Sequence, residues 1–178
     1  VTGLATRLLS NEDAREAALF GGGWQAQTQL LAMDAVRNLK RVWIVNRDAE
    51  RRQAFIATMQ PRVNAELLPA TSPEQAVRNS QIITTITTSR VPVVKGEWLA
   101  PGTHINAAGG NSLLRREVDD DAVLRSNRLV VDSLEQAKIE AGEFFGVIQS
   151  GHRHWQDFIE LRQVVTDPHI GRTDSTDI

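Results

Sequence analysis

Three consecutive glycines, Gly21–Gly23, separate an apolar run from a helical pattern. The run Ala17–Phe20 has the composition of a buried strand, and from Gln25 to Leu39 apolar residues recur close to helical spacing. Glycine at such a joint costs backbone entropy, so something must require a bare backbone there. A strand, a glycine turn and a helix in this order are typical of the first βα unit of a dinucleotide-binding sheet.

The small residues of this loop follow the pattern G-x-G-x-x-A, with Gly21, Gly23 and Ala26 at its three defining positions. Gly21 permits the tight turn out of the strand, Gly23 lets a pyrophosphate approach the backbone closely, and Ala26 lets the helix pack on the strand. The amides at the start of the helix, around Trp24 and Gln25, would point at the phosphates, and the helix dipole would assist. The alternative is an ordinary glycine turn.

The rest of the chain alternates between strand-like and helix-like segments. This pattern predicts an α/β fold of the Rossmann type, which is a doubly wound, mostly parallel six-stranded sheet with helices on both faces. The expected strands are Ala17–Phe20, Arg41–Val45, Asn64–Leu68, Gln81–Ile86, Thr103–Ala108 and Leu129–Val131. The expected helices include Thr2–Leu9, Gln25–Leu39, a helix from Asp48 to Pro61, one beginning after Ser72, Asp119–Leu124, Leu134–Glu140 and Phe158–Val165.

The end of the second strand distinguishes the two nicotinamide cofactors. NAD-binding folds usually place an acidic residue there to bind the ribose hydroxyls, whereas this chain has Asn46 and Arg47. An arginine pairs with a 2′-phosphate, and an asparagine can donate a hydrogen bond to it. We therefore expect NADP(H), with NAD(H) as the alternative. Asp48 is interpreted as the N-cap of the next helix in preference to a ribose ligand.

A hydroxyl-rich loop follows the fourth strand and carries Thr85, Thr87 and Thr88. Strand ends at this edge of a doubly wound sheet face the ligand crevice. The hydroxyl groups could bond the ribose or phosphate of a cofactor, or they could simply cap the loop. The pattern leaves both interpretations open.

Composition excludes several classes of function. The net charge of −2 gives no electrostatic reason to expect nucleic acid or an anionic membrane as a partner. The chain has no cysteine, which excludes thiolate sites and fits a reducing, cytoplasmic location. No metal site is expected, because His152 and His154 have no acidic or cysteine neighbours in the pattern that metals need. His104 lies inside a predicted strand, where a core role is favoured over catalysis.

Several blocks in a consistent order resemble the ornithine cyclodeaminase/mu-crystallin superfamily. They are "GGGWQAQTQL", "VWIVNRDAER", "SPEQAV", "IITTITTSRVPVVKGEWLAPGTHINAAGGN", "RREVDDD" and "VVDSLEQAKIEAGEF", and the central "GEWLAPGTHINA" is specific to this family. The resemblance implies that Thr85 and Thr87 approach the cofactor. It also implies that Asn106, Ala107 and Gly109 line its nicotinamide end. Asn111 stands where the cyclodeaminase has a catalytic aspartate, and an amide cannot act as a carboxylate base.

The resemblance also implies a larger protein. Family members carry an N-terminal domain that binds substrate and forms the dimer, so we expect residues 1–15 to be an entry helix from such a domain. Residues 16–145 would then be the Rossmann core and residues 146–178 a C-terminal helical segment. As a fragment lacking that domain, the chain is expected to be inactive alone.

The predicted function is the NADP(H)-binding domain of a homodimeric oxidoreductase. It would act on the C–N bond of an amino acid or cyclic imino acid, as a ketimine or pyrroline-carboxylate reductase does. The alternatives are a cyclodeaminase that uses bound NAD and a non-catalytic cofactor-binding protein of the mu-crystallin kind. A methyltransferase is disfavoured, because its cofactor normally requires an acidic residue at the position of Asn46.

Overall fold

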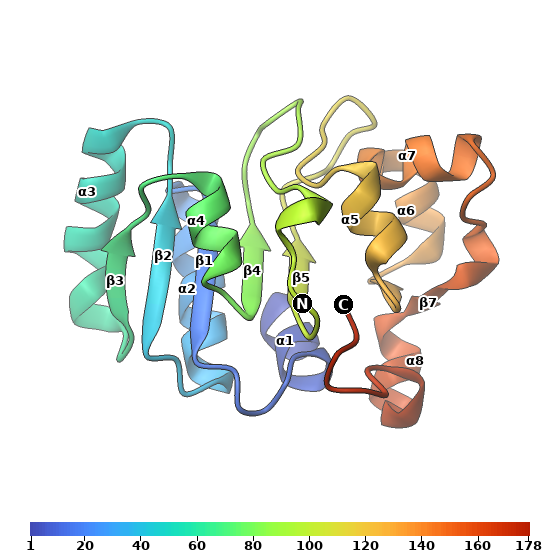
Figure 1. The fold of residues 1–178 in the computed structure, drawn as a ribbon, viewed down its shortest axis with the longest axis horizontal. Helices are drawn as coiled ribbons and strands as arrows, with labels where there is room; N and C mark the ends of the chain where they lie inside the picture. The colour runs from blue at the N-terminus through green and yellow to red at the C-terminus, as the bar shows by residue number, and fades with distance from the viewer.

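The computed structural model describes residues 1–178 and contains a five-stranded parallel sheet flanked by helices (Figure 1). The strand order is β3-β2-β1-β4-β5, and every neighbouring pair is parallel. The strands are β1 (Glu16–Phe20), β2 (Arg41–Val45), β3 (Glu66–Pro69), β4 (Ile82–Thr85) and β5 (His104–Ala107). This order and the α/β architecture confirm the predicted doubly wound fold.

Helices cover both faces of the sheet, because alternate residues of each strand point to opposite sides. Ala17 and Leu19 of β1 belong to the core on one face, whereas Ala18 and Phe20 belong to the core on the other. The helices α2 (Trp24–Val36) and α3 (Ala49–Met59) pack on the first face. The second face is covered by α4 (Pro73–Arg78) and α5 (Asp120–Arg125), with α7 (Gly142–Gln149) beyond them. Both cores are mainly aliphatic.

Four of the helices that follow strands begin with a side-chain cap. Asp48 caps α3, Ser72 caps α4, Asp119 caps α5, and Ser133 caps α6 (Leu134–Glu140). In each case the side-chain oxygen accepts a hydrogen bond from the amide three residues on, which satisfies one of the otherwise unpaired amides of the first turn. The interpretation of Asp48 as an N-cap is confirmed.

The expected sixth strand forms but does not join the main sheet. Leu129–Val131 (β6) pairs in parallel with Phe158–Glu160 (β7) to make a separate two-stranded sheet. The prediction of six strands in one sheet is therefore wrong, and so is that of a helix starting at Phe158, because α8 begins only at Leu161 and ends at Thr166. The physical reason is that β6 and β7 satisfy each other's backbone hydrogen bonds, while residues of β5 and β6 line a cavity. The helix α1 (Thr2–Leu9) packs against α2 and β5.

The C-terminal segment packs beside the amino end of β5 and against the end of α1 (Figure 1). The backbone of the C-terminal turn is bonded to the loop before β5, since the amide of Gly102 donates to the carbonyl of Thr176 at 2.8 Å. Arg172 donates to the carbonyl of Leu9 at the end of α1. The terminal segments thus form one packed unit with the main sheet. None of the helices has both the length and the apolar character needed to cross a lipid bilayer.

Candidate cofactor-binding site

The glycine loop lies where the strand order of the sheet reverses. β1 is flanked by β2 on one side and by β4 on the other, so the connections that leave β1 and β4 run in opposite directions across the sheet. The crevice at the carboxyl ends of such strands is where doubly wound sheets bind ligands. Backbone bonds hold the loop over this point. The amide of Gly21 donates to Val45 at 3.0 Å, and that of Ile86 donates to Phe20 at 2.9 Å.

Gly21 and Gly23 meet different requirements. Gly21 has φ +124°, and a Cβ at this position would lie 2.5 Å from the carbonyl oxygen of Ile86, so only glycine makes the turn. Gly23 has φ −88°, which any residue can adopt, and a Cβ there would meet nothing within 4 Å. The bare backbone at Gly23 is thus not needed for folding. It leaves open space in front of the helix that follows.

The N-terminus of α2 has no side-chain cap, unlike the helices that begin at Asp48, Ser72, Asp119 and Ser133. Its N-cap is Gly23, which offers no side-chain oxygen to the amides of the first turn. Such a turn carries unpaired N–H groups and the positive end of the helix dipole, which together bind phosphate. The residues present therefore fit a pyrophosphate.

The residues that follow Gly23 have the burial that this interpretation requires. Trp24 is 81% exposed and Gln25 is also exposed, so their amides are at the surface of the crevice. Ala26 is buried in the core between α2 and the sheet. A larger side chain at Ala26 would push the helix, and its amides, away from β1.

The end of β2 presents a cation and no free carboxylate. Arg47 is exposed and forms no ion pair or side-chain hydrogen bond. The Nδ2 atom of Asn46 would lie 2.7 Å from a Cβ built on Gly22, which places this side chain against the glycine loop. Asp48 has its Oδ1 in the N-cap bond to the amide of Arg51. Asn46 and Arg47 are therefore available to a phosphate beside the loop.

Of the three threonines at the end of β4 and in the loop after it, one is buried and two are accessible. Thr85 is fully buried, and its hydroxyl donates to Glu117 Oε2 at 2.8 Å. Thr87 is half-buried, with its hydroxyl oxygen accepting from the amide of Ser89, and Thr88 is exposed. Only Thr87 and Thr88 can therefore offer hydroxyl groups to the crevice in this arrangement, because the carbonyl of Thr85 also has a partner, the amide of Ala108.

Residues at the end of β5 show a similar division. Asn106 is buried, and its Nδ2 donates to the hydroxyls of Thr6 and Thr84 at 3.0 and 3.1 Å. Ala107 is exposed, and Gly109 follows at the edge of the crevice. Asn111 is also exposed, and its Oδ1 accepts from Arg115 Nη1 at 2.7 Å. The side chain of Asn106 thus holds α1 on the sheet, while Ala107 and Ala108 after it are exposed residues.

Sequence reasoning assigned no role to Glu117 or Glu143, two buried carboxylates behind these loops. Glu117 accepts hydrogen bonds from residues that lie 8 to 32 positions away along the chain, so no local pattern marks it. Burial is the main cause of a raised pKa for Glu143, whose Oε1 accepts from the amide of Glu117 at 3.2 Å.

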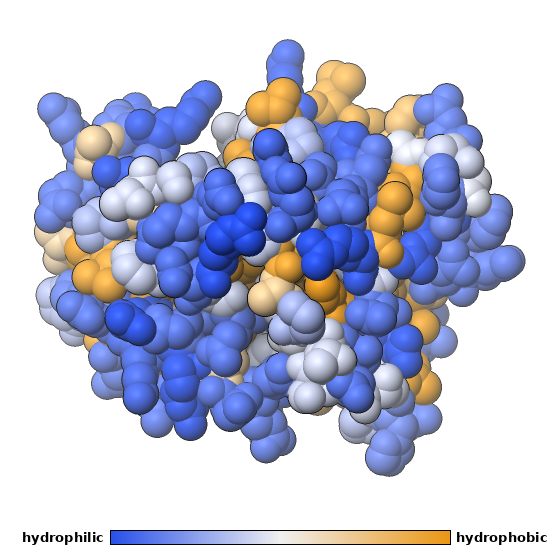
Figure 2. All heavy atoms as spheres, viewed as in Figure 1, coloured by the Kyte–Doolittle hydropathy of each residue, from blue (hydrophilic) through white to orange (hydrophobic).

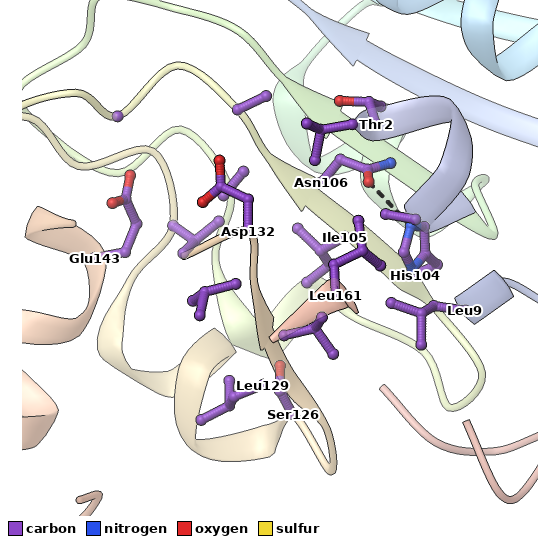
Figure 3. Close-up of a pocket in the computed structure, with 18 of the residues that line it drawn as sticks. Thr2, Leu9, His104, Ile105, Asn106, Ser126, Leu129, Asp132, Glu143 and Leu161 are labelled. Atoms are coloured by element: carbon purple, nitrogen blue, oxygen red, sulfur yellow. Dashed lines mark hydrogen bonds between the residues drawn. The ribbon is translucent and has the colours of Figure 1, made fainter. Parts of the chain in front are cut away.

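A cavity of about 740 Å³ extends from the end of β5 to the two-stranded sheet. Figure 3 shows Glu143 and Asp132 on one side of it and Asn106 and His104 on the other, with Leu129 and Leu161 among the apolar residues of its wall. A cavity of this size, with apolar and polar residues both well represented in its wall, suits a small organic molecule that carries polar groups. It adjoins the exposed residues after β5.

His104 forms part of the buried wall, and its ring nitrogen Nε2 lies 3.1 Å from Asn106 Oδ1. Burial lowers its pKa from 6.5 to about 4. The folded protein therefore holds a neutral imidazole in the range in which the unfolded chain takes up a proton. Stability is accordingly lost as the pH falls from 6.5 towards 4.

We expect His104 to lower the free energy of unfolding by about 3 kcal/mol as the pH falls from 7.5 to 4. Urea unfolding of the parent and of His104→Gln over this range measures it. The parent should lose about 3 kcal/mol more than the variant, which has no imidazole to protonate. Parallel pH profiles for the two proteins would contradict the assignment.

The chain resembles proteins of known activity along its whole length. The profile of the Ornithine cyclodeaminase/mu-crystallin family matches residues 1–178. The Delta(1)-pyrroline-2-carboxylate reductase of Bacillus cereus is 31% identical over all of this chain and 55% of its own length. The ketimine reductase mu-crystallin of Mus musculus is 32% identical over all of this chain and 53% of its own. The chain thus spans about half the length of these relatives.

Among solved structures, the Delta(1)-pyrroline-2-carboxylate reductase of Thermococcus litoralis superposes with a TM-score of 0.94 and 33% identity. The match covers 99% of this chain and 55% of that one, and the solved protein is in complex with NADH and L-proline.

Proposed function

Because the chain belongs to the ornithine cyclodeaminase/mu-crystallin family, we propose that it is the dinucleotide-binding part of an NAD(P)-dependent oxidoreductase. The observation that carries this proposal is the uncapped N-terminus of α2, behind the open space at Gly23. The pyrophosphate would lie on the amides of residues 23–26. The nicotinamide would lie against the ends of β4 and β5, beside Thr87, Ala107 and Gly109. When bound, the cofactor supplies the hydride chemistry, and the chain binds and orients it.

The substrate class we propose is a small amino acid or its cyclic imine. The cavity beside the end of β5 supports it, since it combines apolar walls with the carboxylates of Asp132 and Glu143 and the exposed amide of Asn111. An amide at position 111 cannot remove a proton as a carboxylate does. This favours reduction of a C=N bond over cyclodeamination, for which the family resemblance implies an aspartate at that position.

The longer protein is proposed to be a homodimer in which further chain covers the carboxyl edge of the sheet. Figure 2 shows hydrophobic side chains gathered at the top of the molecule, over the loops that follow β4 and β5. Val91, Leu113 and Leu114 of these loops are large exposed hydrophobic residues. Exposed apolar clusters commonly mark contact surfaces. Sedimentation of the full-length protein tests the dimer.

We propose NADP(H) in preference to NAD(H), because Arg47 is free beside the glycine loop. Arg47→Ala is expected to weaken NADPH binding about tenfold, since a charge-assisted bond to phosphate contributes about 1.5 kcal/mol or more. NADH has no 2′-phosphate, so its affinity should stay within about twofold. Calorimetric titration with both nucleotides measures the change. Arg78→Ala, which removes an exposed arginine of α4 paired with Glu74, is the control and should alter neither affinity.

Equal affinities of the parent for the two nucleotides would count against the phosphate contact while leaving dinucleotide binding intact. Absence of any binding by the parent would overturn the proposed function itself.

A further inference from the structure

The ladder between β4 and β5 ends just where the two crevice loops begin. Its last paired residues are Thr85 and Ala107, and one further bond joins the amide of Ala108 to the carbonyl of Thr85 at 2.9 Å. Beyond this point the two strands no longer bond each other directly. The next amides that point between the two loops, those of Thr87 and Gly109, are partly buried and therefore require another acceptor.

The carboxylate of Glu117 is that acceptor. Its Oε1 accepts from the amide of Thr87 at 2.5 Å, and its Oε2 accepts from the amide of Gly109 at 2.7 Å and from the hydroxyl of Thr85 at 2.8 Å. Glu117 is fully buried and has no ion-pair partner. One side chain thus bridges the two loops at the place where the next rung of the sheet would be.

Glu117 is itself held from behind. Its amide donates to Glu143, and its carbonyl accepts from the amides of Val93 and Val94 at 2.8 and 3.0 Å. On the side of the loops, a Cβ on Gly109 would come within 2.7 Å of both Thr87 and Glu117, so the carboxylate is closely packed between the two loops. The distance between the two loops is therefore set by this side chain.

We propose that Glu117 is a positioning residue for the nicotinamide half of the cofactor. It fixes the spacing between Thr85–Thr87 and Ala107–Gly109, the two segments against which that half would lie. It does not touch the adenosine half, which belongs to the glycine loop and the end of β2. This inference rests on the proposed function, because it assumes that a dinucleotide occupies the crevice.

Glu117→Gln separates positioning from general packing. The amide side chain keeps the size of the carboxylate and one acceptor oxygen, but its NH₂ group would face a backbone N–H and leave that donor unpaired. We expect one of the two loops to move away. Hydrogen exchange should then show reduced protection at Thr87 or Gly109 in the absence of any nucleotide.

The binding test compares whole dinucleotides with their adenosine parts. The affinity of the 178-residue chain for NADH is compared with its affinity for ADP-ribose. Its affinity for NADPH is compared with that for 2′-phospho-ADP-ribose. Glu117→Gln is expected to weaken the tighter-binding dinucleotide about tenfold, while its adenosine part stays within about twofold. Fluorescence of the bound reduced nicotinamide should fall towards that of the free cofactor.

Asp177→Asn is the matched control. Asp177 is also a buried carboxylate, and it accepts hydrogen bonds from the amides of Thr173 and Asp174 and from the hydroxyl of Thr173. Unlike Glu117, it lies near the amino end of β5. Its substitution should destabilise the fold to a similar degree and leave the ratio of the two affinities unchanged. Thr85→Val, which removes one donor and keeps the carboxylate, should shift the ratio in the same direction as Glu117→Gln by a smaller factor. If Glu117→Gln does not fold, the affinity ratio measured for Thr85→Val tests the inference in its place.

The inference is overturned if Glu117→Gln weakens both members of a pair equally, or if it changes neither. It is also overturned if the parent binds the dinucleotide no better than its adenosine part. A parent that binds none of the four nucleotides would instead refute the proposed function, so the two failures are distinguishable.

Discussion

Gly23→Asp is expected to lower nucleotide affinity about 100-fold or more without destabilising the protein. Gly23 has extended N-cap geometry, with φ −88° and ψ −173°, and open space in front of it. An aspartate there would accept bonds from the amides of the first turn and stabilise α2 by a few tenths of a kcal/mol. The same carboxylate would occupy the phosphate position and repel a pyrophosphate.

Calorimetry with NADPH and NADH, together with urea unfolding, measures both sides of this prediction. Gly23→Ser adds a cap without a charge, so its loss of affinity should be smaller. Gly21→Ala is the opposite control. It places a side chain at φ +124° and 2.5 Å from the carbonyl oxygen of Ile86, so it should lower stability by about 1 kcal/mol or more. Full nucleotide affinity in Gly23→Asp would show that phosphate does not bind at α2.

Arg37→Met is expected to lower the free energy of unfolding by about 3 kcal/mol. Arg37 is buried near the C-terminal end of α2, and no carboxylate pairs with it. Its guanidinium instead donates to the carbonyls of Thr6, Arg7 and Ser10, among others, at 2.9–3.0 Å. The carbonyl of Thr6 also accepts from the amide and the hydroxyl of Ser10, whereas those of Arg7 and Ser10 lie at the end of α1, where a helix has no internal donors for them. Methionine would fill a similar volume and leave the carbonyls of Arg7 and Ser10 without the guanidinium donor.

Arg41→Met is the control for this change. Arg41 also makes several side-chain hydrogen bonds, all to Glu16, but it is on the surface, where solvent screens the pair. We expect little measurable change in its urea unfolding curve. If the two substitutions cost the same, the carbonyl contacts of Arg37 contribute no more to stability than an exposed ion pair does.

Features governed by local chemistry were predictable from the sequence. The strand, the Gly21–Gly23 turn and the helix after it follow from periodicity and from the freedom of glycine, and Asp48 and Ser72 cap helices as their positions indicate. The parallel doubly wound arrangement follows from the alternation of strands and helices. The bare helix start at Gly23 was also foreseeable, because no Ser, Thr, Asp or Asn occupies that position.

The sequence by itself thus determined the fold class, the glycine loop and the cation at the end of β2. The glycine loop and the cation depend on residues within a few positions of one another, and the fold class depends on the order of locally formed strands and helices. Only the tertiary structure decided that β6 pairs with β7, that Thr85 and Asn106 turn inward, and that Glu117 joins two loops. Each of these depends on which distant segments meet, because a buried donor or a strand edge bonds to whatever acceptor packing brings within about 3 Å, and local pattern carries no record of that neighbour.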